Sequence, residues 1–185
     1  LSSDGLQRVR LLYLYPSEVK DPLLSTMLEL PTVVPYFDLS LQHASRPLLA
    51  RMKRWGSGDI FSEFIARIRS ARPDAAFRSS FIVGFPGETE ADHDALLDFL
   101  GEVQLDWAGF FPYSREDGTA AAALDGIVAE ELMHDRLSEC SAVSDDRHGA
   151  VMAVEHLIAL GHRRIAFLGE SALISTSRNR YGGYI

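Results

Sequence analysis

The sequence predicts an α/β protein built on a parallel sheet, and three observations lead to this prediction. Continuous apolar runs, such as residues 81–83, are typical of strands covered on both faces. Segments with apolar residues at helical spacing separate these runs. Strand and helix alternate at steps of roughly thirty residues, as in βα units. We therefore expect a partial (β/α) TIM-like barrel of parallel strands.

The first part of this core is expected to contain two strands and three helices. Residues 7–15 are rich in β-formers and predict a strand, and a short helix should follow over 22–30. A second strand is expected over 33–41, although Pro35 favours an entry position. Ser45 precedes the next helix. Asp59 is the predicted N-cap of a third helix, whose apolar face comprises Ile60, Phe61, Phe64, Ile65 and Ile68.

The second part repeats the pattern. A strand is expected over 76–83, a helix after Thr89, a strand over 105–113 and a further helix over about 128–139. The helix after Thr89 should bury Leu96, Leu97, Leu100 and Val103. An unpaired edge beside the strand over 105–113 would invite docking by another strand or self-association.

The turn between residues 84 and 89 is the strongest local indication of a site. Gly84 and Gly87 allow the backbone to approach a ligand closely, and Thr89 with Asp92 predicts a capping box. Strand-to-helix crevices of this kind hold the ligands of open α/β sheets and β/α barrels. A tight turn without a ligand has the same pattern, so the pattern alone leaves both interpretations open.

Bulk properties narrow the class of protein. The chain has 185 residues, of which 46% are hydrophobic and 24% charged, as expected for one globular domain or one domain and part of another. A net charge of −8 argues against generic nucleic-acid binding. No run is long and apolar enough for a membrane span and no signal peptide is evident, so a cytoplasmic location is the default expectation. Because the chain starts at Leu1, we expect it to be incomplete.

Four motifs in order carry a family resemblance: 36–45 (YFDLSLQHAS), 51–54 (RMKR), 81–89 (FIVGFPGET) and 113–119 (YSREDGT). Together they resemble radical S-adenosylmethionine (SAM) methylthiotransferases. Gln42 with His43 and the last motif favour the RimO branch, which modifies an aspartate of a small-subunit ribosomal protein, over the tRNA-modifying MiaB branch. The resemblance covers about 1–139, where we expect a radical SAM core fragment with a ribosomal protein as its substrate.

This resemblance implies a barrel-type core that binds SAM over the strand ends, and a [4Fe–4S] cluster that cleaves SAM reductively. By motif position, the SAM-binding residues would be Asp38, Gln42, Arg78, Ile82, Val83, Gly84 and Glu88. Within this set, residues 82–84 would lie by the adenine and Glu88 would brace the turn. The others would lie near the ribose, methionine or substrate. Asp38 and Gln42 could equally be strand-end caps, and Arg78 could simply pair with a neighbouring carboxylate.

The family's cluster requires three cysteines at CxxxCxxC spacing, because thiolates hold the iron. This sequence has one cysteine, Cys140, which is in no such motif. We therefore expect no catalytic residues and no radical reaction from this piece alone. His148, His156 and His162 do not predict a metal site, because no acidic cluster completes them.

From residue 142 onward a second resemblance appears. Residues 143–150 (VSDDRHGA), 155–169 (EHLIALGHRRIAFLG) and 180–184 (RYGGY) resemble the effector-binding domain of LacI-type repressors. This implies a flavodoxin-like, periplasmic-binding-protein-like βα segment over 140–185, with Asp146 and Arg180 near a sugar or purine effector. No DNA-binding headpiece is present, so no direct DNA binding is expected.

Inside this segment, a helix is predicted up to Gly161 and a strand over 164–169. Three hypotheses therefore stay open: a fragment of a RimO-like enzyme, a LacI-like regulatory module, and an artificial or chimeric fusion without evolved activity. They differ in the expected ligand, which is SAM for the first, a sugar or nucleoside for the second, and none for the third.

Overall fold

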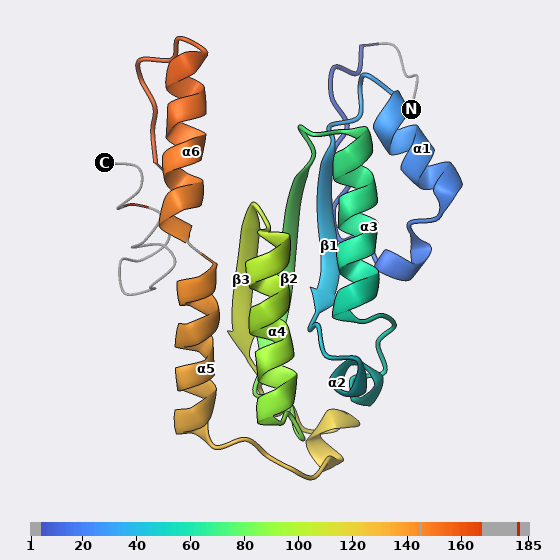
Figure 1. Cartoon of the computed structure of the whole chain (residues 1–185), viewed down its shortest axis with the longest axis vertical. Helices are drawn as coiled ribbons and strands as arrows, with labels where there is room; N and C mark the ends of the chain where they lie inside the picture. Colours follow the sequence, from blue (N-terminus) through green and yellow to red (C-terminus); the bar gives the residue numbers. More distant parts are fainter. Residues whose placement is uncertain (1–4, 145, 168–180, 182–185) are drawn as a thin grey trace.

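A computed structural model describes residues 5–144, 146–167 and 181, and its core is a three-stranded sheet (Figure 1). The strands are β1 (Tyr36–Gln42), β2 (Ala76–Val83) and β3 (Trp107–Pro112), which pair in parallel in the order β1-β2-β3. Helices connect successive strands, as parallel pairing requires. The predicted α/β class with a parallel sheet is thereby confirmed, whereas closure into a barrel stays a prediction.

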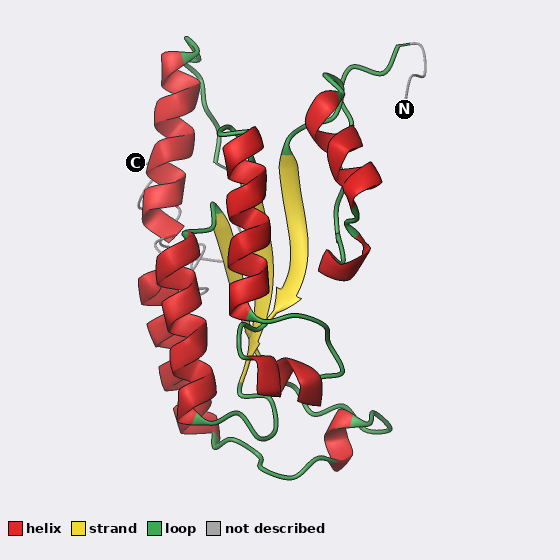
Figure 2. Cartoon of the chain, turned by 45° about the vertical axis from the view of Figure 1, so that its right-hand side comes forward, coloured by secondary structure: helices red, strands yellow, loops and turns green. Residues whose placement is uncertain are grey.

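The helices and short 3₁₀ segments are η1 (Pro16–Glu18), α1 (Asp21–Glu29), α2 (Arg46–Arg51), α3 (Gly58–Ala71), α4 (Glu90–Val103), η2 (Ala121–Ala123), α5 (Glu130–Val143) and α6 (Asp146–Ala159). Helices α3 and α4 lie over one face of the sheet, and α5 follows beside α4 (Figures 1 and 2). No helix of the described part of the chain is long and apolar enough to cross a bilayer.

Aromatic rings fill the space between the sheet and this helix layer. Phe37 of β1 stacks on Phe77 of β2 with ring centroids 5.3 Å apart. Phe81 stacks on Phe110 of β3 and meets Phe99 of α4 edge-on. Rings in these geometries add to the stabilisation that burial of apolar surface provides.

The sheet has a second face, which we call the open face. Along β2, residues 77, 79, 81 and 83 are buried under the helices, while 78, 80 and 82 are only partly buried. The open face consists of Asp38 and Gln42 of β1, Arg78, Ser80 and Ile82 of β2, and Trp107 and Phe111 of β3. The expectation that the run 81–83 is covered on both faces is thus wrong at Ile82, which points away from the helix layer.

The predicted strand over 7–15 is wrong. This segment makes only two isolated parallel bridges, Val9 to Val33 and Leu14 to Leu39. The backbone of Tyr13 has a φ of +56°, a left-handed conformation that interrupts an extended chain. The next strand starts at Tyr36, directly after Pro35, rather than at residue 33.

Helix starts were predicted with mixed success. Ser45 caps α2 by accepting the Leu48 N–H, and Thr89 with Asp92 forms the predicted capping box of α4. Asp59 is not an N-cap, because α3 starts at Gly58 after Ser57, and its carboxylate lies in the first turn. Leu97 is half-buried, unlike the other predicted apolar positions of α4.

At the C-terminal side, α5 continues through Cys140 to Val143, across the position where the two resemblances meet. The division of the chain at 139/140 into two units stays a prediction. Gly161 follows α6 with a φ of +88°, as predicted for a helix end. Residues 164–167 form no strand, and the rest of the predicted strand over 164–169 lies outside the described residues, as do Arg180 and the side chain of Asp146.

Candidate functional site

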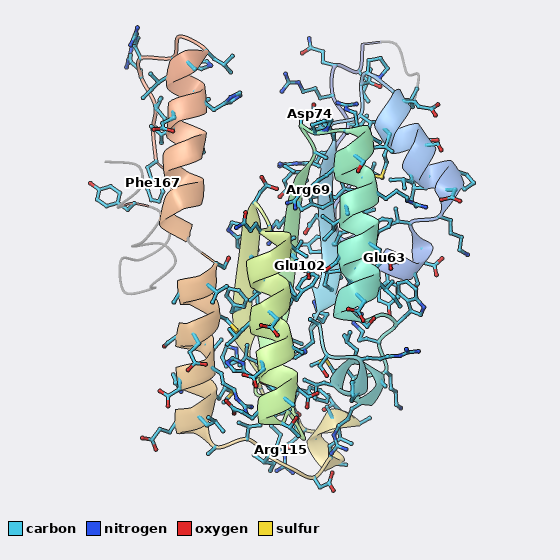
Figure 3. All side chains as sticks on the ribbon, viewed as in Figure 1. Glu63, Arg69, Asp74, Glu102, Arg115 and Phe167 are labelled. Atoms are coloured by element: carbon cyan, nitrogen blue, oxygen red, sulfur yellow. The ribbon has the colours of Figure 1, made fainter. Side chains whose placement is uncertain are left out.

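A groove of about 400 Å³ lies where the strands of the sheet end. Its lining comes from the ends of β1, β2 and β3 and from the loops that follow them: Gln42, Ser80, Ile82, Phe85, Phe111, Pro112, Tyr113 and Ser114. Parallel sheets bind ligands at this carboxyl edge. Figure 3 shows Arg115 at this end of the molecule and Asp74 at the opposite end.

Two of the predicted SAM-binding residues line the groove directly. Ile82 presents its side chain from the open face of β2, and Gln42 reaches in from the end of β1. Gln42 has a φ of +71° and its Nε2 lies 3.4 Å from the carbonyl oxygen of Ser80. The left-handed backbone ends β1 and sends the amide across the neighbouring strand, so β1 and β2 jointly form one wall.

Asp38 and Arg78 lie on the same open face but are not among the groove-lining residues. The Arg78 Nη1 donates to Asp38 Oδ1 at 2.8 Å, and the guanidinium lies 4.1 Å from the ring centroid of Trp107. The pairing with a neighbouring carboxylate, considered from the sequence, is therefore formed. It links all three strands beneath the groove.

Val83 points the other way. Its side chain is fully buried on the helix-covered face, so it does not contribute to the groove surface. The main-chain oxygen of Val83 accepts the Tyr113 N–H at 2.8 Å, which holds the loop after β3 against the end of β2. Val83 thus positions Tyr113, a groove residue that opens the motif 113–119 but was not among the predicted SAM-binding residues.

Glu88 braces the turn, as the resemblance implied. Its Oε2 accepts the main-chain N–H groups of Gly84 and Phe85. Burial raises the pKa of the Glu88 carboxyl, against the lowering effect of the Gly84 N–H and of Arg136. A carboxylate held in this way fixes the direction of both amides at the edge of the groove.

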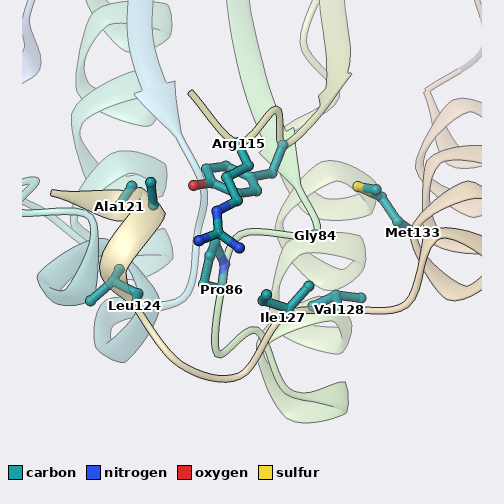
Figure 4. Close-up of a pocket in the computed structure, with 10 residues that line it drawn as sticks. Gly84, Pro86, Arg115, Ala121, Leu124, Ile127, Val128 and Met133 are labelled. Atoms are coloured by element: carbon teal, nitrogen blue, oxygen red, sulfur yellow. The ribbon is translucent and has the colours of Figure 1, made fainter. Parts of the chain in front are cut away.

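A second, smaller cavity of about 120 Å³ lies beside this turn and shares Tyr113 with the groove (Figure 4). Gly84, Pro86 and Arg115 line it together with residues from η2 and the start of α5. Gly84 has a φ of +79°, and a Cβ there would come 2.5 Å from the Met133 sulfur. The turn therefore requires glycine for both its conformation and its contact with α5.

Two arginines hold the turn, and neither role was predicted from the sequence, although Arg51 begins the motif 51–54. Arg51 donates from Nε to the Pro86 carbonyl at 2.7 Å and forms an ion pair with Asp125. Arg136 of α5 is buried and pairs with Glu88. Arg51 lies within a basic stretch and Arg136 within a largely polar helix, so neither position differs in pattern from a solvated helix face.

His43, half of the pair that favoured the RimO branch, lies in the core and not in the groove. Its Nδ1 accepts the Ser45 N–H at 3.0 Å, and burial lowers the pKa of the imidazole to about 4. Neutral His43 therefore helps to fix the connection between β1 and α2.

The described residues do not offer the ligands of an iron–sulfur cluster. They contain no group of three or more His, Cys, Asp or Glu side chains placed to hold a metal ion. The Cys140 thiol is completely buried in α5, and burial raises its pKa to about 12. A thiol of this kind is poorly suited to iron, which binds the thiolate.

Comparison with solved structures gives the class of fold. Coproporphyrinogen III oxidase from Escherichia coli, described as a radical SAM enzyme, matches with a TM-score of 0.61 and 15% sequence identity. The match covers 86% of this chain and 34% of that chain. The chain thus shares its fold with part of a radical SAM enzyme.

Comparison with characterised sequences is more specific. The ribosomal protein uS12 methylthiotransferase RimO of Cutibacterium acnes is 50% identical over 143 residues, which is 77% of this chain and 30% of that protein. RimO of Moorella thermoacetica is 50% identical over 133 residues, or 72% of this chain and 31% of that protein. The matched region is homologous to the radical SAM methylthiotransferase RimO, and the chain spans about 30% of its relatives' length.

No protein-family model matches the chain. The predicted LacI-type resemblance of residues 142–185 finds no support in the comparisons, nor does a chimeric origin. The short apolar and glycine motifs on which that resemblance depended are typical of many βα segments.

Proposed function

We propose that this chain forms the SAM-binding side of a RimO-type radical SAM methylthiotransferase. The observation that carries the proposal is the groove at the carboxyl edge of the sheet, bordered by the braced turn at 84–88, in a region homologous to RimO. In the whole enzyme, the substrate would be ribosomal protein uS12, the protein named in its relatives.

The groove has a chemistry that suits a nucleoside with a polar tail. Ile82, Phe85 and Phe111 offer apolar surface for a purine ring, and Gln42 and Ser114 offer polar groups at the rim. Its volume of about 400 Å³ is within the range of small-molecule sites. The Tyr113 hydroxyl is buried without a hydrogen-bond partner among the described residues, and Tyr113 lines both the groove and the smaller cavity.

SAM bound here would supply the methyl group and, after reductive cleavage, the radical of the family's chemistry. The role of this chain's own residues is to bind and orient it. Gln42 and Tyr113 would make polar contacts, Ile82 would contact the adenine, and Glu88 would hold the Gly84 and Phe85 amides in place. The Arg78–Asp38 ion pair would stabilise the face of the sheet on which the groove lies. The described residues do not fit the iron–sulfur cluster, so no step through it is assigned to them.

Calorimetric titration of the full chain with SAM and with S-adenosylhomocysteine tests the proposal. We expect both to bind, because the groove contacts do not require the methyl group. Gln42→Ala should weaken binding about tenfold or less, as expected for the loss of one polar contact. Gln104→Ala is the matched control, since Gln104 also has a left-handed backbone (φ +46°) but lies at the end of α4.

Two results would contradict the proposal. One is the absence of heat with either ligand at millimolar concentration. The other is an equal loss of affinity in both glutamine variants, which would indicate a general effect of alanine at a left-handed position.

A further inference from the structure

We propose that Arg136 of α5 is a positioning residue for the proposed SAM site, acting through the Glu88 carboxylate on the turn at 84–88. The inference rests on the proposed function, since it concerns how that same site is kept in its binding geometry. No contact of Arg136 with a ligand is needed, because Glu88 stands between the guanidinium and the turn.

The two carboxylate oxygens of Glu88 have different hydrogen-bond partners. Oε2 accepts the N–H groups of Gly84 and Phe85, the second at 3.2 Å. Oε1 faces Arg136, whose Nη1 lies 3.3 Å away and also 3.3 Å from the main-chain oxygen of Glu88. Arg136 therefore holds both the side chain and the backbone of the residue that orients the turn.

Arg136 is itself held in place. Its second terminal nitrogen, Nη2, donates to Glu90 Oε2 at 2.9 Å at the start of α4. Its side chain is only 4% exposed, and that of Glu88 is fully buried. The guanidinium thus connects α5 to the first turn of α4 and to the edge of the groove at once. The planar guanidinium of arginine can donate to two partners at once, so it suits this position better than the ammonium group of lysine.

The charges around Glu88 come from two helices. From α4, His93 lies with Nδ1 3.9 Å from Glu88 Oε1, and its Nε2 is 2.7 Å from Glu139 of α5. From α5, Arg136 and the buried Cys140 thiol also face this carboxyl, and Glu90 pairs with the far side of Arg136. Arg136 is the only permanent cation in this set, and with the Gly84 N–H it opposes the rise in the Glu88 pKa that burial causes.

Loss of that cation changes what Glu88 presents to the turn. Burial already raises the pKa of Glu88, and Arg136 is among the groups that lower it. Without Arg136, Glu88 takes up a proton at higher pH and its carboxyl becomes a weaker acceptor for the two amides. The turn then loses its fixed direction in a manner that depends on pH. A merely structural role of Arg136 would not produce this dependence.

The test compares SAM affinity of the full chain between about pH 6 and pH 8.5 for the wild type, Arg136→Met and Arg136→Lys. We expect Arg136→Met to weaken SAM binding about tenfold near pH 6, as for the loss of one charged interaction, and to recover part of the affinity at pH 8.5. Arg136→Lys should retain most of the affinity. Arg67→Met is the matched control, because Arg67 forms an exposed ion pair with Asp21 on the outer helices.

Amide hydrogen exchange at Gly84 and Phe85 provides a readout that needs no ligand. At the same pH, exchange should be faster in Arg136→Met than in the wild type. The ratio of the two exchange rates should be larger at low pH than at high pH. If Arg136→Met does not fold, the double variant Glu88→Gln with Arg136→Met removes both buried charges, and its affinity should be low without pH dependence. A folded Arg136→Met variant with wild-type affinity and wild-type exchange at every pH would overturn the inference. Wild-type protein that fails to bind SAM while these exchange differences persist would instead overturn the proposed function alone.

Discussion

The Arg78 guanidinium and the Asp38 carboxylate meet at 2.8 Å between neighbouring strands, at positions that are also paired in the register of the sheet. Asp38 is only 6% exposed at its side chain and Arg78 29%. The open face of the sheet therefore carries a partly buried ion pair on the same side as the candidate groove.

Arg78→Ala should destabilise the protein by about 1–3 kcal/mol, because the buried Asp38 carboxylate loses its cation. Among the described residues, it then keeps only the Tyr13 N–H, at 3.3 Å. Urea unfolding monitored by circular dichroism measures this loss. Arg67→Ala breaks an ion pair with both side chains more than half exposed and should cost no more than about 0.5 kcal/mol. Equal costs for the two variants would show that the Arg78 pair is not effectively buried.

Stability should fall as pH decreases from about 6.5 to about 4 because of His43. Burial lowers the pKa of this imidazole to about 4, so the unfolded chain takes up a proton in this window and the folded chain does not. Above pH 6.5 this effect does not reduce the free energy of unfolding. Protonation of His43 in the unfolded chain then lowers the free energy of unfolding by about 3 kcal/mol by about pH 4. His43→Gln should flatten the stability profile in this window. A slope as steep in His43→Gln as in the wild type would contradict the assignment.

Gly84→Ala should destabilise the turn by at least about 1–2 kcal/mol, because alanine is strained at a φ of +79° and its Cβ meets Met133. Adding Met133→Ala removes the steric part and leaves the backbone strain. Gly101→Ala in α4 is the comparison, since nothing lies within 4 Å of an added Cβ there. It should stabilise the helix by up to about 1 kcal/mol. Thermal unfolding of the three variants checks the order, and a neutral Gly84→Ala would show that the turn can adopt another conformation.

The capping box of α4 gives a fourth prediction. Thr89→Ala should lower stability by about 1 kcal/mol, because the Thr89 hydroxyl accepts the Asp92 N–H and donates to the Asp92 carboxylate. Ser57 occupies the corresponding position before α3 but makes no such hydrogen bond. Ser57→Ala should therefore have a smaller effect in the same chemical denaturation experiment. A larger loss at Ser57 would contradict this account of the helix starts.

Much of the fold could be predicted because local patterns and tertiary packing agree. The run 76–83 forms a strand with the predicted bounds, and the Thr89 capping box starts α4 where expected. The segment 7–15 failed because β-propensity describes a pleated, half-buried surface and not a backbone preference. The left-handed Tyr13 limits its pairing to isolated bridges.

Only those residues of the candidate site that belong to the sequence motifs could be predicted. Glu88 braces the turn and Gln42 lines the groove, and both belong to the motifs that carry the family resemblance. Their contact with SAM stays a prediction. The roles of Arg51 and Arg136 were not predicted, because each depends on a partner that is far away in the sequence, 35 positions for Arg51 and 48 for Arg136. Sequence periodicity carries no information on such distant partners.

The two edges of the sheet differ in one further respect. Leu14 bridges β1 on its outer side, where it donates to the Asp38 carbonyl and accepts the Ser40 N–H. Within the described part of the chain, no strand pairs with the outer side of β3. The segment around Leu14 thus occupies main-chain groups of β1 that another strand would need. A second copy of the chain could not pair with this edge without displacing that segment.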